Sequence, residues 1–165
     1  MRRGVRLGID VGAARIGVAR SDIEGTLAVP VETIHLTKSS AAKAGKGVQH
    51  TTNPIEQIGR LIAEYEVLEV LVGNPLGLSG REGKAAELAR DFAQKVAQAN
   101  PDTPVILLDE RLSTVQAQQN LHSAGISTRQ GRSMIDQAAA VIILQTALDA
   151  ERSTGAQLGT ILGRP

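Results

Sequence analysis

The closely spaced strands at the start of the chain are the feature that most constrains its fold. Residues 5–11 alternate between apolar side chains and polar or glycine positions, a period of two that predicts a strand. Residues 15–20 and 27–34 predict two further strands, and Pro30 assigns the third to an edge of the sheet. Three strands joined by such short connections indicate an antiparallel meander.

The remainder of the chain alternates helices with strands. We expect these elements in order at residues 54–65 (helix), 67–72 (strand), 84–99 (helix), 105–108 (buried strand), 113–122 (short helix) and 132–148 (helix). Right-handed crossovers put the fourth and fifth strands beyond the first and parallel to it. The predicted fold is therefore α/β, with a mixed five-stranded sheet in the order 3-2-1-4-5 and helices on both faces.

The length of 165 residues predicts one folded domain, since a domain typically has about 150 residues. We assign residues 1–150 to this domain and residues 151–165 to a C-terminal tail. Residues 37–52 show no periodicity and are rich in Ser, Ala, Gly and Lys, which predicts a mobile basic loop. An added basic arm is the other interpretation of this loop.

Composition excludes several classes of function. The chain has no Cys, which excludes disulfide scaffolds, Cys-ligated zinc and thiol catalysis. It has no Trp, one Tyr and one Phe, too few for a nucleic-acid reader that stacks bases on aromatic rings. A net charge of +1 means that a polyanion must be met by a local basic patch. We find neither a membrane-spanning segment nor a secretory signal, and expect a cytoplasmic protein without a membrane partner.

Three acids occupy positions where an apolar residue would be expected. Asp10 lies within the first strand, Glu110 follows the buried fifth strand, and Asp136 begins an otherwise apolar helix. Ligands of such sheets bind outside the carboxyl ends of the parallel strands, where Asp10 and Glu110 emerge. The first and fifth strands lie roughly 10 Å apart across the fourth, so their side chains can converge.

Carboxylates without Cys or paired His favour Mg²⁺ or Mn²⁺ as the bound ion. Such an ion can activate water and stabilise a leaving phosphate oxygen. Taken singly, each acid also has a structural interpretation: Asp136 complementing the helix dipole, Asp10 stabilising a turn, and Glu110 pairing with Arg111. The convergence of all three favours a metal site.

Three segments resemble one family of bacterial proteins in their order and spacing. LGIDVGAARIGVA at the start, LLDERLST in the middle and IDQAAAVIIL near the end are similar to the YqgF/RuvX family. The resemblance implies an RNase H-like fold and a nuclease, described either as maturing the 5′ end of pre-16S ribosomal RNA or as resolving Holliday junctions. It also implies that the catalytic, metal-holding acids are Asp10, Glu110 and Asp136. One-metal and two-metal chemistry both stay open, because three acids are found where such sites often have four.

Basic residues and a glycine-rich loop complete the expected site. Arg15 and Arg111 match family motifs and are candidates for contacts with phosphate. The other candidates for nucleic-acid binding are Lys38, Lys43, Lys46, Arg81, Arg129 and Arg132. The loop that begins at Gly73 and Asn74 and reaches Gly80 could offer backbone N–H groups to a phosphate.

Four functions compete at this point. The first is a Mg²⁺-dependent nuclease that acts on structured RNA; the second is a resolvase of branched DNA. RNA processing ranks higher, because a resolvase needs two symmetric sites and the sequence announces no dimer interface, although monomer and homodimer both stay open. A non-catalytic nucleic-acid-binding module is the third alternative. An actin-like or sugar-kinase-like phosphate binder is the fourth, but those folds pair two such domains and this chain has length for one.

Overall fold

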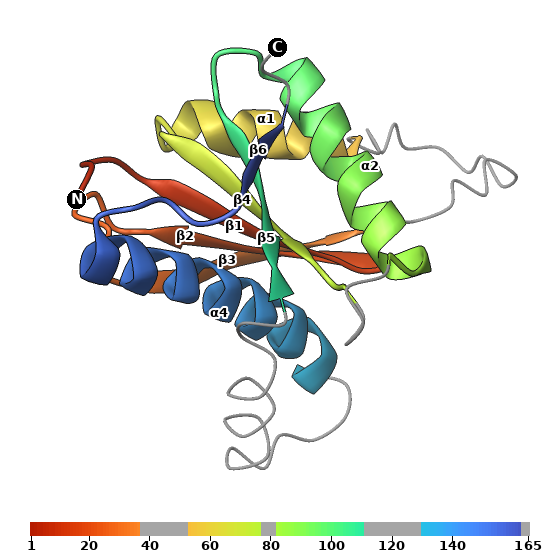
Figure 1. Ribbon diagram of the computed structural model, residues 1–165. Coiled ribbons are helices and arrows are strands. Elements are labelled where there is room, and N and C mark those ends of the chain that lie inside the picture. Colours follow the sequence, from red (N-terminus) through yellow and green to blue (C-terminus); the bar gives the residue numbers. More distant parts are fainter. Residues whose placement is uncertain (37–52, 77–81, 111–129, 163–165) are drawn as a thin grey trace, which may run out of the picture.

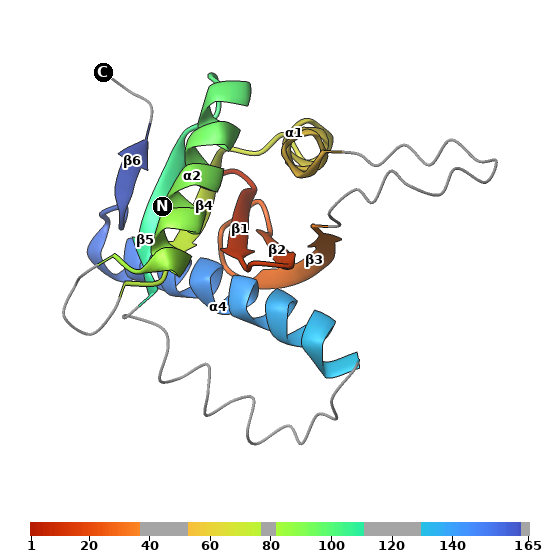
Figure 2. The same cartoon turned by 90° about the vertical axis from the view of Figure 1, so that its right-hand side faces the viewer.

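One mixed β-sheet organises the molecule. The structure is a computed structural model that describes residues 1–36, 53–76, 82–110 and 130–162, with side chains from residue 137 onward in the last range. The sheet has six strands in the order β3-β2-β1-β4-β5-β6. Helices α1 and α2 cover one face and helix α4 covers the other (Figures 1 and 2).

The central strand β1 (Arg6–Val11) joins the two halves of the sheet. It pairs antiparallel with β2 (Arg15–Ser21) and parallel with β4 (Glu69–Asn74). Beyond β2 lies the antiparallel edge strand β3 (Ala28–His35), and beyond β4 lies the parallel strand β5 (Val105–Asp109). The predicted α/β class and the order 3-2-1-4-5 are confirmed.

A sixth strand was missed by the sequence analysis. β6 (Thr160–Leu162) lies within the predicted tail and pairs antiparallel with β5. It has only three residues, too few for a detectable alternation. Gly159 precedes it with a φ of +95°, and a Cβ at this position would clash with the Leu107 carbonyl, so glycine is needed where the chain turns onto the edge of β5.

The helices follow from their caps and apolar spacing. α1 (Pro54–Glu64) has Pro at its first turn, and the Asn53 side chain accepts a hydrogen bond from the Ile55 N–H at 3.0 Å. α2 covers Lys84–Ala99 as predicted, whereas α4 (Gln130–Thr154) extends beyond the predicted helix at both ends. None of the helices in the described ranges is both long and apolar enough to cross a membrane. The predicted loop 37–52 and short helix 113–122 lie outside the described residues.

The two faces of the sheet carry separate apolar cores, because successive side chains of a strand point to opposite faces. Leu7, Ile9, Val70 and Val72 belong to the core under α1 and α2. On the other face, α4 buries Ala140, Ile143, Leu144, Ala147 and Leu148 in the second core. The sheet is thus covered on both sides.

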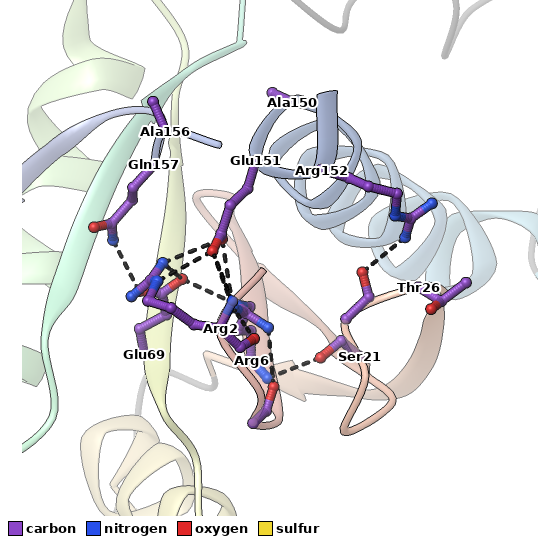
Figure 3. A network of polar contacts seen from close by, with 12 residues as sticks. Arg2, Arg6, Ser21, Thr26, Glu69, Ala150, Glu151, Arg152, Ala156 and Gln157 are labelled. Atoms are coloured by element: carbon purple, nitrogen blue, oxygen red, sulfur yellow. Dashed lines mark hydrogen bonds and ion pairs between the residues drawn. The ribbon is translucent and has the colours of Figure 1, made fainter. Parts of the chain in front are cut away.

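A buried ion-pair network closes the amino ends of the parallel strands (Figure 3). The Glu69 carboxylate accepts hydrogen bonds from Arg2 at 2.9 and 3.0 Å, from Arg6 Nε at 3.1 Å and from Gln157 at 2.8 Å. Glu151, near the end of α4, accepts two from the Arg2 guanidinium at 3.1 Å and lies 3.4 Å from Arg6 Nη2. Arg6 and Glu69 are fully buried, so each charge depends on its partners.

These contacts also affect the titration of Glu151. Burial acts to raise the pKa of its carboxyl, but hydrogen bonds from Arg2 and the positive charges of Arg6 and Arg2 outweigh burial and hold that pKa below its ordinary value. The network therefore joins the N-terminal segment, β1, β4 and α4 at the end of the sheet remote from the predicted site.

Candidate active site

Asp10 lies on the face of the sheet that α4 covers, and two glycines are its neighbours there. Gly8, two residues earlier, faces α4 so closely that a Cβ there would lie 2.7 Å from Leu144 Cβ and 2.9 Å from the Ala140 carbonyl oxygen. Side chains two residues apart in a strand share a face, so Asp10 projects on the same side. Its partner across β2 is Gly17. The residue of β2 directly opposite Asp10 therefore has no side chain.

Glu110 reaches the same place from the end of β5. It follows Asp109 directly, and Leu108 of β5 pairs with Gly73 of β4. A Cβ on Gly73 would overlap the Glu110 carboxylate and would lie 2.6 Å from Ile143 Cδ1 of α4. The Glu110 carboxylate thus lies over the backbone of Gly73, on the α4 face of the sheet.

The two carboxyl groups meet in this space. Asp10 and Glu110 form a side-chain hydrogen bond, and both are half-buried. Burial, the negative charge of Asp10, the hydrogen bond with Asp10 and the charge of Asp109 together raise the pKa of Glu110 to about 7, and burial contributes most. Two carboxyls in such contact need either a shared proton or a cation.

Asp136 lies in α4, and its side chain is outside the part that the structure describes. It precedes Ala140 by four residues and Ile143 by seven, and both of these are buried against the sheet. The described side chains, which do not include that of Asp136, contain no group of three His, Cys, Asp or Glu residues that could hold a metal ion. The structure therefore brings two of the three predicted acids into contact and places the third on the helix that covers them.

Arg15 is the predicted basic residue that the structure describes in full. It begins β2, two residues before Gly17, and so shares the α4 face with Asp10. Its carbonyl accepts a hydrogen bond from the Gly12 N–H at 2.8 Å, which closes the turn between β1 and β2. The backbone of Arg132 lies in α4. The other predicted basic residues lie outside the described ranges: Lys38, Lys43, Lys46, Arg81, Arg111 and Arg129.

The first two residues of the predicted phosphate loop belong to a strand. Gly73 and Asn74 are the last two residues of β4, because their pairing with Leu108 and Asp109 continues the sheet beyond the predicted end at residue 72. Gly80 lies outside the described residues. The structure gives Gly73 a steric role, which is to leave room for Glu110.

Two contributions to the site escaped the sequence analysis. By the alternation of side chains along β5, Asp109 is expected on the face opposite Glu110, yet its charge helps to raise the pKa of Glu110. The signal in the sequence that could have indicated this effect is that Asp109 directly precedes Glu110. Ile143 of α4 closes the space above Gly73, and no sequence pattern could reveal this, because it depends on how the helix is aligned along the sheet.

Two solved structures of RuvC have a similar fold. Thermus thermophilus RuvC in complex with a Holliday junction substrate superimposes with a TM-score of 0.53 at 17% identity, covering 93% of this chain and 98% of that one. Thermus thermophilus RuvC in a second structure gives a TM-score of 0.53 at 16% identity, with coverage of 94% and 99%. At this identity the likeness establishes the fold alone, and it agrees with the RNase H-like architecture that the family resemblance implied.

Curated relatives are much more similar in sequence. Proteins named "Putative pre-16S rRNA nuclease" from Streptomyces coelicolor and Nocardioides sp. are each 50% identical, over 94% and 98% of this chain and 86% and 98% of their own lengths. One of the same name from Thermobifida fusca is 48% identical, over 93% of this chain and 92% of its own. The profile of the family described as "RuvX: Holliday junction resolvase" matches residues 4–150. On this evidence the chain belongs to the RuvX family.

Proposed function

We propose that this protein is a divalent-metal-dependent nuclease that hydrolyses phosphodiester bonds in structured RNA and matures the 5′ end of pre-16S ribosomal RNA in the cytoplasm. The observation that carries the proposal is the contact between the Asp10 and Glu110 carboxyls at the carboxyl ends of the parallel strands. A hydrogen-bonded acid pair contributes little to stability there, because burial and mutual repulsion both oppose its ionisation.

The residues present fit a hard divalent cation. Asp10 and Glu110 offer carboxylate oxygens, which Mg²⁺ and Mn²⁺ prefer, and a cation between them would remove the need for a shared proton. We assign Asp136 as the third carboxylate, because α4 carries it toward the same end of the sheet. When bound, the ion supplies a Lewis acid that activates water and balances charge on the phosphate.

The remaining groups would bind and orient the substrate. Arg15 shares the sheet face of Asp10, where a guanidinium can hold a phosphate oxygen with two hydrogen bonds. Arg111, Arg132 and the lysines of residues 37–52 would extend this contact along the nucleic acid. Backbone N–H groups of the segment from Gly73 through Asn74 to Gly80 are the proposed contact for a neighbouring phosphate.

The choice of RNA rests on the relatives, since proteins about 50% identical over nearly the whole chain carry the name of a pre-16S rRNA nuclease. Resolution of Holliday junctions is the second candidate. It is favoured by the description of the family profile and by the likeness of the fold to RuvC.

The test is cleavage of a labelled pre-16S rRNA leader and of a four-way DNA junction, each with Mg²⁺ or Mn²⁺. Wild type is compared with Asp10→Asn and Glu110→Gln, which keep the shape of the side chains and remove the charges. Asp91→Asn, at an exposed position on α2, is the matched control. Binding to each substrate is measured separately by fluorescence anisotropy at fixed salt.

We expect specific cleavage of the rRNA leader, abolished in both site variants and retained in Asp91→Asn, with binding retained in all. Cleavage of the junction alone would replace the proposed function by the resolvase. Acid-independent binding without cleavage of either substrate would identify a non-catalytic module.

A further inference from the structure

A side-chain hydrogen bond ties α4 to the sheet at the level of the acids. Gln137 Nε2 donates to Thr33 Oγ1 of β3 at 3.0 Å, and both side chains are half-buried. Gln137 directly follows Asp136 in α4. The bond thus fixes the turn of the helix that carries the third proposed metal-holding acid.

Thr33 lies in the same row of the sheet as Asp10. Thr33 pairs with Gly17 in β2, and Gly17 pairs with Asp10 in β1. Directly paired residues project on the same face of an antiparallel sheet, so Thr33 and Asp10 both face α4, separated by a glycine. A helix residue bonded to Thr33 is therefore held at the position along the strands where Asp10 stands.

Two more side chains anchor α4 to the same hairpin by hydrogen bonds, but farther from the acids. Gln145 accepts a hydrogen bond from the Ala28 N–H at 2.8 Å and donates to the Thr26 carbonyl at 3.0 Å. Arg152 donates to the Gly25 carbonyl at 2.9 Å. Residues 137, 145 and 152 follow one another at intervals of eight and seven, which return to one stripe of a helix. This polar stripe (Gln137, Gln145 and Arg152) follows β3 and the turn before it.

The members of the polar stripe differ in what they can affect. The C-terminal end of α4 is attached to the sheet by the Arg2–Arg6–Glu69–Glu151 network and by Arg152. The middle of α4 is attached by Gln145. Among the described side chains, Gln137 makes the anchoring hydrogen bond nearest to Asp136. Its loss would leave the helix folded and attached while freeing the turn next to the acids.

We propose that Gln137 and Thr33 are a positioning pair, which sets α4 along the sheet so that Asp136 is held at the level of Asp10 and Glu110. The inference rests on the proposed nuclease function, because the pair affects catalysis only if Asp136 holds the metal ion together with Asp10 and Glu110. Loss of the bond would displace the helix turn at the site, and a displacement of about 1 Å can cost roughly a hundredfold in rate.

The experiment compares Gln137→Met and Thr33→Val with Gln145→Met, which removes two hydrogen bonds from the same helix to the same hairpin. Thr33→Ser restores the hydroxyl without the methyl group. Two readouts are taken: kcat and KM for rRNA-leader cleavage, and hydrogen exchange of the α4 backbone amides, which needs neither metal nor substrate.

We expect Gln137→Met and Thr33→Val each to lower kcat by about 10- to 100-fold with KM nearly unchanged, and the double variant to be no worse than either single one. Exchange should accelerate in the N-terminal half of α4 alone. Thr33→Ser should retain activity, and Gln145→Met should change exchange in the middle of the helix with kcat unchanged.

Unchanged exchange at the start of α4 in Gln137→Met and Thr33→Val would overturn the inference. So would accelerated exchange with an unchanged kcat, provided that Asp10→Asn is inactive. If the wild type itself cleaves nothing, the proposed function fails and the catalytic purpose of the pair fails with it. The exchange pattern would then still show whether the bond positions the helix.

Discussion

The Glu110 carboxylate lies over Gly73, in the space where any other residue at position 73 would carry its Cβ. Glu110 extends from the end of β5 across β4 and so reaches Asp10 on β1. The absence of a side chain on the strand between them is therefore what allows the two acids to meet.

Gly73→Ala tests this relationship directly. The added methyl group must displace Glu110 or Ile143 Cδ1, and we expect cleavage to fall by about a hundredfold or more. Overpacking should also lower the free energy of unfolding by about 1–3 kcal/mol. Kinetics and urea denaturation measure the two effects.

Gly59→Ala is the matched control, because a Cβ at that position of α1 would meet Asn100 Oδ1 at an ordinary contact distance of 3.6 Å. It should leave activity intact and raise the free energy of unfolding by about 0.5–1 kcal/mol. Full activity in Gly73→Ala would contradict the role given to Gly73.

The pH dependence of stability should carry the signature of Glu110. Burial, with the charge of Asp10 and the hydrogen bond to it, raises the pKa of Glu110 from 4.5 to about 7. The folded chain thus holds this proton more tightly than the unfolded chain does. The resulting stabilisation is complete below pH 4.5 and is lost as the pH rises through about 7.

Without metal, we expect the free energy of unfolding of wild type, relative to Glu110→Gln, to fall by the order of 2 kcal/mol between about pH 4 and pH 8. Urea denaturation in the presence of a chelator measures it. Parallel pH profiles for the two proteins would show that Glu110 titrates normally.

Divalent cations should stabilise the protein through the same acids. At pH 8, where the pair lacks its proton, Mg²⁺ or Mn²⁺ at about 100 times its Kd should add about 2.7 kcal/mol to the free energy of unfolding. The gain should vanish in Asp10→Asn and be absent with Na⁺ at equal ionic strength. A thermal-shift titration is sufficient, and an equal rise in Asp10→Asn would place the cation elsewhere.

Arg6→Met should destabilise the fold from the other end of the sheet. It removes a buried partner of Glu69 and Glu151, and breaking a buried pair costs about 3–5 kcal/mol. Arg3→Met disrupts the exposed pair with Glu24, 2.8 Å apart, and should cost less than about 1 kcal/mol. Equal effects in the two variants, measured by urea denaturation, would show that the network is dispensable.

Much of the fold could be predicted because its signals are local. The alternation in β1, the cap of α1 and the apolar spacing of α2 each lie within one segment, and crossover handedness then gives the strand order. β6 could not be predicted, since its strand conformation depends on the free edge of β5 rather than on its own three residues.

The candidate site was predictable to a lesser degree. Asp10 and Glu110 were recognisable as acids at strand ends, and the structure brings them into contact; their catalytic role stays a prediction. Gly73 was assigned to a phosphate loop, since a sequence does not show which side chain will fill the space above a glycine. The bond from Gln137 to Thr33 joins residues 104 positions apart, and no local pattern specifies it.

The two ends of helix α4 have different roles: the C-terminal end contributes to stability, and the N-terminal end lies over the candidate site. With 25 residues it spans roughly 37 Å, from Asp136 near one end to Glu151 near the other. Charges at its C-terminal end are satisfied by arginines, whereas the acids beneath its N-terminal end oppose one another. The effect of a substitution in α4 should therefore depend on its position. Substitutions near Glu151 should change mainly the stability of the fold, and those near Gln137 should change mainly the rate of cleavage.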